Sequence, residues 1–177
     1  MLYQFVKFVA VAVACLFVAA CQTSGLKPGS LETSYAPAGW VQKDKGKKSY
    51  YVCPPNQCKS LQLIAVEPSD VKGNAEQAIR ANILSSGLLK EIGNSVNRAS
   101  QGKLKLLSQK RIVKKNYSGF EVNFVIKGRN GKTLFFASRL IVQGDRGSEV
   151  ISVATSQRTA QANLNNFMRK TSIQRLP

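Results

Sequence analysis

The sequence predicts an α+β fold: a meander of antiparallel strands with one helical segment before it and one after it, packed as a three-layer sandwich. Apolar and polar residues alternate through residues 119–127, which is typical of a strand. Apolar residues recur every three or four positions in residues 75–96 and again in residues 156–168, which is typical of helices. The order helix, strands, helix is the basis of the predicted architecture.

The globular domain is expected to cover residues 40–177 and to begin with a β-hairpin. Residues 40–42 and 49–52 are its predicted strands. The turn between them, residues 43–48, contains four lysines and is expected to be solvated. Trp40, the single tryptophan of the chain, is expected to fill a gap in the core.

After the hairpin the pattern changes from strand to helix. Residues 61–66 are apolar enough for another strand, which residues 67–70 should break. Asn74 with Gln77 three residues later is typical of a helix start. Ser85-Ser86-Gly87 should kink or split this helix, and its apolar stripes are expected to belong to the core rather than to a partner groove. The stripes are Ala75, Ala78, Ile79 and Ile83, followed by Leu88, Ile92 and Val96.

From residue 103 onward the period becomes two, as in β-strands. Residues 103–115 carry six lysines and arginines, and one straight strand would put Lys110 and Lys114 on the face opposite the others. This predicts a bulge, or an edge strand whose charges block sheet-to-sheet association. In residues 119–127, inward positions are Phe120, Val122, Phe124 and Ile126, and outward positions are Glu121, Asn123 and Lys127.

The last part of the chain predicts two more strands and a helix. Asn130-Gly131 predicts a two-residue hairpin turn, and residues 132–142 return with apolar side chains on both faces, so both faces should be covered. A turn at residues 144–147 leads into a strand at residues 149–154. A helix should start near Ser156 and bury Ala160, Leu164, Phe167 and Met168.

Residues 1–20 have the organisation of a secretory signal peptide, with Lys7 before an apolar core at residues 8–17. The following Val18-Ala19-Ala20-Cys21 resembles the lipobox of bacterial lipoproteins. The resemblance implies that Cys21 becomes the first mature residue and carries a diacylglycerol on its thiol and a further acyl chain on its amine. Ala12-Val13-Ala14-Cys15 is a weaker match that leaves too short an apolar core, so Cys15 is expected to be removed.

This resemblance implies a palmitate-type lipid anchor in the outer membrane, with the protein facing the periplasm, and Gln22 is compatible with that location. Residues 21–39 are expected to be an extended, mobile tether, because glycines, prolines and serines interrupt any periodicity.

The chain is strongly basic, with 26 lysines and arginines against nine acidic residues. Removing Lys7 with the signal peptide leaves a net charge of about +16, so anionic surroundings are expected. The partners that we expect are the membrane, through the lipid, and an anionic lipid, lipopolysaccharide, cell-wall polymer or envelope protein. A surface that is basic for solubility alone is the alternative.

The sequence predicts a non-enzymatic binding or scaffolding module without cofactor, metal or catalytic residues. It contains no histidine, which removes the commonest general base and most catalytic zinc sites. An envelope hydrolase using the carboxylates of Glu67, Asp70 and Glu121 is one alternative. Extracytoplasmic nucleic-acid binding is another, but the basic residues 103–115 lack the interleaved aromatic residues on which bases would stack.

Two sets of site residues follow. Cys53 and Cys58 are the only cysteines expected to remain besides Cys21. Because the compartment outside the cytoplasm is oxidising, they predict a local disulfide. The second set is an anion-binding cluster next to the turn at residues 116–119: Lys110, Arg111, Lys114 and Lys115. Protection of an edge strand is the rival explanation of this cluster.

Part of the C-terminal half is similar in pattern to the second half of a PsbP-like domain. The similarity lies in Gly119-Phe120-Glu121, Asn130-Gly131, Arg139-Leu140-Ile141-Val142, a final strand and a packing helix. It implies a non-catalytic binding or assembly module. That family has no catalytic motif, so the resemblance assigns no functional residue.

Overall fold

The computed structural model describes residues 25–128 and 131–177. The signal peptide and Cys21 lie outside the described residues. Nine strands and three helices are described: β1 Leu31–Thr33, β2 Val41–Lys45, β3 Lys48–Val52, β4 Gln62–Ser69, α2 Ala75–Arg80, α3 Ser86–Ala99, β5 Leu104–Val113, β6 Ser118–Lys127, β7 Thr133–Gln143, β8 Arg146–Ala154, α4 Gln157–Arg169 and β9 Thr171–Ile173.

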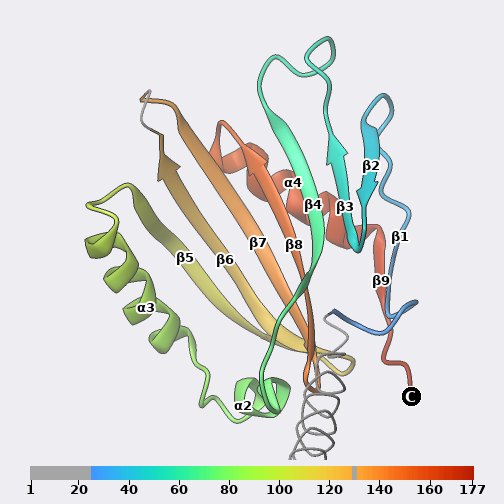
Figure 1. The fold of residues 1–177 in the computed structure, drawn as a ribbon, viewed down its shortest axis with the longest axis vertical. Helices are drawn as coiled ribbons and strands as arrows, with labels where there is room; N and C mark the ends of the chain where they lie inside the picture. Colours follow the sequence, from blue (N-terminus) through green and yellow to red (C-terminus); the bar gives the residue numbers. More distant parts are fainter. Residues whose placement is uncertain (1–24, 129–130) are drawn as a thin grey trace, which may run out of the picture.

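Seven strands form one antiparallel sheet in the order β2-β3-β4-β8-β7-β6-β5. Helix α4 packs on one face of this sheet, and α2 and α3 lie on the other side, next to β5 (Figure 1). The predicted α+β fold with helices flanking an antiparallel sheet is therefore confirmed. The short strands β1 and β9 pair separately, antiparallel to each other.

The main core lies between the sheet and α4. The Ser156 hydroxyl caps this helix by accepting from Thr159 N, as the sequence predicted, and Leu164 and Phe167 are fully buried. The ring of Tyr35 lies 5.2 Å from that of Phe167 and edge-on to Trp40 and Tyr51. Burial raises the pKa of Tyr35 to about 12. This aromatic cluster joins the start of the domain to its last helix.

The mobile tether predicted for residues 21–39 is wrong for its described part. Ser30 and Tyr35 are buried, and β1 pairs with β9 in the register Leu31↔Ile173. The globular domain therefore begins well before Trp40. The sequence pattern did not reveal this strand, because glycines and prolines interrupt it and its pairing partner lies at the other end of the chain.

The break predicted at residues 67–70 is also wrong, because β4 continues through Pro68 to Ser69. Beyond Val66, β4 pairs with β8 only, since the register with β3 ends there. A proline lacks the N–H that a second neighbour would need, so Pro68 is tolerated at this local edge of the sheet.

The second core cluster lies on the opposite face of the sheet, where Ala75 and Ile79 of α2 pack on Phe120 and Val142. Asn74 caps α2 by accepting from Gln77 N, which confirms the predicted helix start. Ser85 caps α3 in the same way through Leu88 N, so the predicted split is also confirmed.

The apolar stripe predicted for the core is wrong over much of its length. Ile83 lies in the turn after α2 and is 72% exposed, and no residue of α3 is buried. Helix α3 instead contacts β5 through its neighbouring face, where an added Cβ on Gly93 would lie 2.5 Å from Leu106. The close approach at Gly93 turns the stripe partly toward solvent, and its exposed members are Leu88, Ile92 and Val96.

Strand β5 is the edge strand that the sequence predicted, and its register with β6 shifts between Leu106 and Ser108, which confirms the bulge. Two positions of β6 that were predicted to point outward are not exposed to solvent. Asn123 is buried and donates to Ser108 Oγ at 2.8 Å, and Glu121 pairs with Arg139. Both lie on the face that α4 covers, where buried polar groups need partners.

The β6–β7 hairpin is present, but its connection is longer than the two residues predicted. The strands end at the pair Lys127↔Thr133, and Gly128 N donates to Lys132 O at 2.8 Å. Gly131 has the positive φ of 73° that favours glycine, and Asn130 lies outside the described residues.

Gly119→Ala should destabilise the protein by about 3 kcal/mol or more, because an added Cβ would lie 1.8 Å from Leu140 O of the neighbouring strand. The midpoint of thermal unfolding should fall by roughly 6–12 °C. Gly87→Ala is the matched control: its Cβ would meet only Ser85 Oγ at 3.6 Å, so stability should stay or rise. Equal midpoints for the two variants would contradict the close β6–β7 contact.

Candidate anion-binding site

The β5–β6 turn is a basic feature at the end of the sheet next to α2, and it presents Lys114 and Lys115 to solvent. Lys114 N donates to Tyr117 O at 2.9 Å and closes the turn. Asn116 Nδ2 donates to Ile173 O, and Gln143 Nε2 donates to Asn116 O, each at 3.0 Å. The two lysines therefore project from a backbone that is fixed to β7 and to the end of β9.

The other two residues of the predicted cluster do not join them. Arg111 lies opposite Phe120, and its Nη1 donates to Ile79 O at 2.8 Å. It therefore caps the C-terminal carbonyls of α2 and is a structural residue. Lys110 lies opposite Glu121 on the α4 side of the sheet. The four-residue cluster is split between two faces, because neighbouring residues of a strand point in opposite directions.

The structure adds two arginines that the sequence pattern did not indicate. Arg80 Nη2 donates to Lys114 O at 2.6 Å, so the end of α2 lies against the basic turn. Arg175, beyond β9, pairs with Glu76 on the same helix. A surface hollow of about 430 Å³ is lined by Asn74, Glu76, Gln77, Arg80, Lys115 and Arg175.

Glu76 positions both arginines. Its carboxylate is buried and accepts from Arg80 Nε at 3.0 Å, from Arg175 and from Gly144 N at 2.7 Å. Burial raises the pKa of Glu76, but the hydrogen bonds from Arg175, Gly144 and Arg80 outweigh it and lower the pKa to about 2. The spacing of Glu76 and Arg80, four residues apart on a helix, was the one sequence signal that could have identified this pair.

A second hollow of about 390 Å³ lies on the other side of the turn. Its lining includes Lys114, Lys115, Asn116 and Arg139, so Lys115 borders both hollows. Lysine and arginine donors with amide groups suit phosphate or carboxylate oxygens. This arrangement can bind an anion, and it contains no nucleophile paired with a base.

Of the three carboxylates considered for a hydrolase, Glu67 and Glu121 are not brought together. Glu67 on β4 pairs with Lys48 at 2.7 Å, and Glu121 on β6 pairs with Arg139, with β8 and β7 between them. Over residues 25–128 and 131–177, no three side chains of the metal-ligating types histidine, cysteine, aspartate and glutamate gather at one point. In the same residues, no helix has the length and apolar character needed to span a bilayer.

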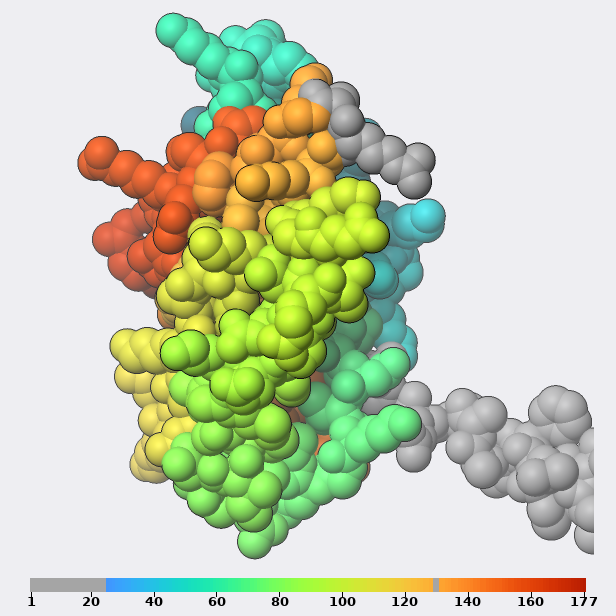
Figure 2. Space-filling model, turned by 90° about the vertical axis from the view of Figure 1, so that its left-hand side faces the viewer, coloured from blue at the N-terminus to red at the C-terminus, as the bar shows by residue number. Residues whose placement is uncertain are grey.

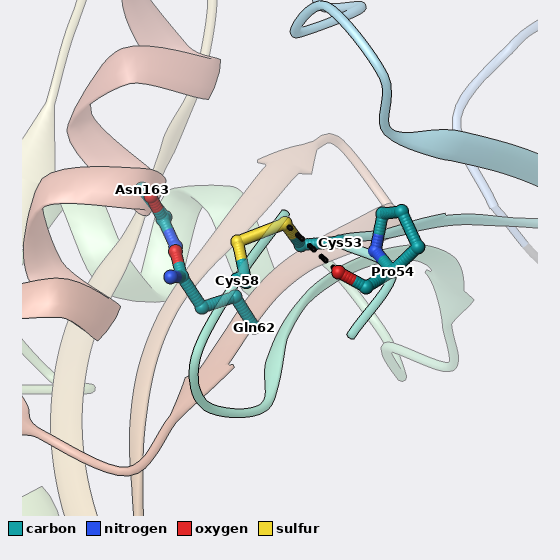
Figure 3. Close-up of a disulfide and its surroundings, with 5 residues drawn as sticks. All are labelled: Cys53, Pro54, Cys58, Gln62 and Asn163. Atoms are coloured by element: carbon teal, nitrogen blue, oxygen red, sulfur yellow. Dashed lines mark hydrogen bonds between the residues drawn. A yellow bond between two sulfur atoms is a disulfide. The ribbon is translucent and has the colours of Figure 1, made fainter. Parts of the chain in front are cut away.

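Cys53 and Cys58 form the predicted disulfide, with their Cα atoms 5.9 Å apart (Figure 3). It closes the loop between β3 and β4, and Asn163 of α4 donates to Gln62 Oε1 at 2.9 Å beside it. The dashed 3.9 Å contact from Cys53 Sγ to Pro54 O is not a hydrogen bond, because a disulfide sulfur carries no proton. The disulfide lies near the β4 start and contributes nothing to the basic turn.

The sequence matches no family model and no curated protein. Similar solved structures include the cyanobacterial PsbP protein (CyanoP) of Synechocystis, at 14% identity and a TM-score of 0.47, with 84% of this chain and 89% of that chain covered. A protein from Bacteroides thetaiotaomicron is similar at 8% identity and a TM-score of 0.43, with 82% and 46% covered. Neither likeness identifies a ligand or a site residue.

Glu76→Gln should destabilise the protein by about 2–3 kcal/mol at neutral pH, because hydrogen bonds to a buried charge are lost. The folded pKa of about 2 lies below the ordinary 4.5, so this stabilisation is complete above about pH 4.5 and is lost as the pH falls toward 2. Urea unfolding of both proteins across this range should show their difference shrinking with acid.

Glu67→Gln is the control, because Glu67 and Lys48 form a half-exposed pair that contributes less than about 1 kcal/mol. A Glu76→Gln variant as stable as the Glu67→Gln variant would show that the carboxylate does not hold the site together.

Proposed function

We propose that the chain is a lipid-anchored, non-enzymatic binding module of the outer membrane, facing the periplasm, whose basic turn binds an anionic envelope component. The observation that carries the proposal is the pair of exposed lysines, Lys114 and Lys115, on a fixed turn beside Arg80. A fixed turn loses little conformational entropy when it binds, so a few cations can act together.

The positive charges of this surface favour the binding of an anionic ligand. Glu76 is already neutralised by Arg80 and Arg175, so Lys114 and Lys115 have their charge available for a ligand. Single exposed ion pairs contribute about 0–1 kcal/mol, and therefore several must combine for binding. Phosphates of lipids or lipopolysaccharide and carboxylates of cell-wall polymers offer such repeated charges.

The anchor is proposed from Val18-Ala19-Ala20-Cys21, which resembles a lipobox. The Cys53–Cys58 disulfide supports the same compartment, since disulfides persist where the surroundings are oxidising. Acyl chains at Cys21 would hold the domain at the membrane, because each buried CH₂ adds about 0.8 kcal/mol.

Lys114→Glu with Lys115→Glu should weaken binding of unacylated residues 21–177 to phosphatidylglycerol vesicles about 30-fold or more, since each surface cation contributes about 1 kcal/mol at an anionic membrane. This segment contains both core clusters and every described element. Vesicle sedimentation over a salt series measures the loss, and wild-type binding should weaken with salt because exposed charges are screened.

Lys43→Glu with Lys45→Glu is the matched control, because these exposed lysines make the same charge change on β2, at the opposite edge of the sheet from β5. The control should bind nearly as wild type. If both double variants lose affinity equally, net charge alone explains the binding and the basic turn is not the site.

Cys21→Ser should abolish acylation and leave an unprocessed precursor that retains residues 1–20. Metabolic labelling with radioactive palmitate and gel mobility measure the two effects. Cys15→Ser is the control and should be processed and labelled as wild type. Label incorporated into the Cys21→Ser protein would mean that the lipobox assignment is wrong.

A further inference from the structure

Ile83 is held in solvent by the turn between α2 and α3. Asn82, which follows the C-cap residue Ala81 of α2, adopts a left-handed φ of 61°, and Ile83 N donates to Ala78 O at 2.9 Å. These features fix the backbone, and the Ile83 side chain is 72% exposed. An apolar side chain held outward by a fixed turn has no role in the core that we have described.

Two further exposed apolar residues lie on segments connected to this turn. Leu88, on the first turn of α3, follows it in the chain, and Val113, at the end of β5, precedes Lys114, whose carbonyl accepts from Arg80 Nη2. Arg111 joins the segments, because its N–H donates to Ser86 Oγ at 3.1 Å and its side chain donates to Ile79 O. We call Ile83, Leu88 and Val113 the apolar tip. In Figure 2 the green segment with α2 and this turn forms the lower end of the surface, and α3 continues upward from it.

The apolar tip lies beside the cations of the basic turn. Arg80 directly precedes the α2–α3 turn, and its Nη2 donates to Lys114 O at 2.6 Å. Lys114 in turn follows Val113 in the chain. One end of the molecule thus combines protruding apolar side chains with the basic residues Arg80, Lys114 and Lys115. Surfaces that lie in the headgroup region of a bilayer have this composition.

The described chain begins at the same end of the sheet. Leu26 N donates to Ser148 Oγ at 3.3 Å, and an added Cβ on Gly25 would lie 2.9 Å from Pro68 Cβ, so this segment lies against the ends of β4 and β8. Glu76 joins α2 to the β7–β8 turn at that end (Figure 1). Four residues from Cys21 to Gly25 span at most about 14 Å, so an acylated Cys21 would keep this end close to the bilayer.

We propose that the apolar tip inserts Ile83 into the headgroup–acyl boundary of an anionic bilayer while Arg80, Lys114 and Lys115 contact lipid phosphates. The inference rests on the proposed anchor and deepens the proposed function by naming a lipid surface as the anionic partner. The patch has three apolar side chains, whereas a stable protein interface buries about 800 Å² on each partner. Three apolar side chains surrounded by cations therefore fit a membrane surface better than a protein interface of that area.

The test uses the acylated full chain with Trp40→Phe, so that a new tryptophan is the single one present. Ile83→Trp, reconstituted in phosphatidylglycerol vesicles, should show blue-shifted emission and strong quenching by lipids brominated on the acyl chains. Val41→Trp is the matched control, because Val41 is 44% exposed on β2, at the far edge of the sheet, and should be quenched several-fold less. Equal quenching at positions 83 and 41 would overturn the inference.

A second measurement separates this inference from the proposed function. Ile83→Ser in unacylated residues 21–177 should weaken binding to phosphatidylglycerol vesicles about tenfold, because one inserted isoleucine side chain is lost. If Ile83→Ser binds as wild type while the Lys114→Glu, Lys115→Glu variant still loses affinity, membrane insertion is wrong and the basic turn stands. A photo-crosslinker at position 83 that captures a protein instead of lipid in living cells would also overturn insertion.

Discussion

The hydrogen bonds of the buried Glu76 carboxylate are the interaction on which the end of the molecule with α2 and the basic turn depends. It joins α2 through Arg80, the β7–β8 turn through Gly144 N and the C-terminal segment through Arg175. Its charge is stabilised by these donors despite burial, as its pKa of about 2 indicates. Because Arg80 also contacts Lys114 O, the same carboxylate indirectly positions the basic turn.

A second constraint holds the two ends of the described chain together. Strand β1 pairs with β9, and the Tyr35 ring packs against Phe167 of α4. The first and last strands of the described chain therefore lie side by side. Asn116 of the basic turn donates a hydrogen bond to Ile173 O of the same β9. A lipid at Cys21 would consequently orient the domain, because the described chain is packed against the fold from Gly25 and Leu26 onward.

The exposed features of the molecule differ between the two edges of the sheet. Strand β2 is exposed along its length and carries lysines, which discourages pairing with another strand. The β5 edge is covered by α3, whose close approach at Gly93 leaves Leu88, Ile92 and Val96 partly in solvent. The lysines of the β2 edge and those of the β5–β6 turn thus occupy different places, and the proposed function concerns the turn.

The sequence by itself determined the features whose causes are local. The α+β class, the caps at Asn74 and Ser156, the split at Ser85 and the Cys53–Cys58 disulfide all depend on residues close together in the chain. The tertiary structure alone decided the β1–β9 pairing, the exposure of Ile83 and the grouping of Arg80 and Arg175 with Lys115. Those outcomes depend on which distant surfaces pack best, and helical or strand periodicity contains no information about that.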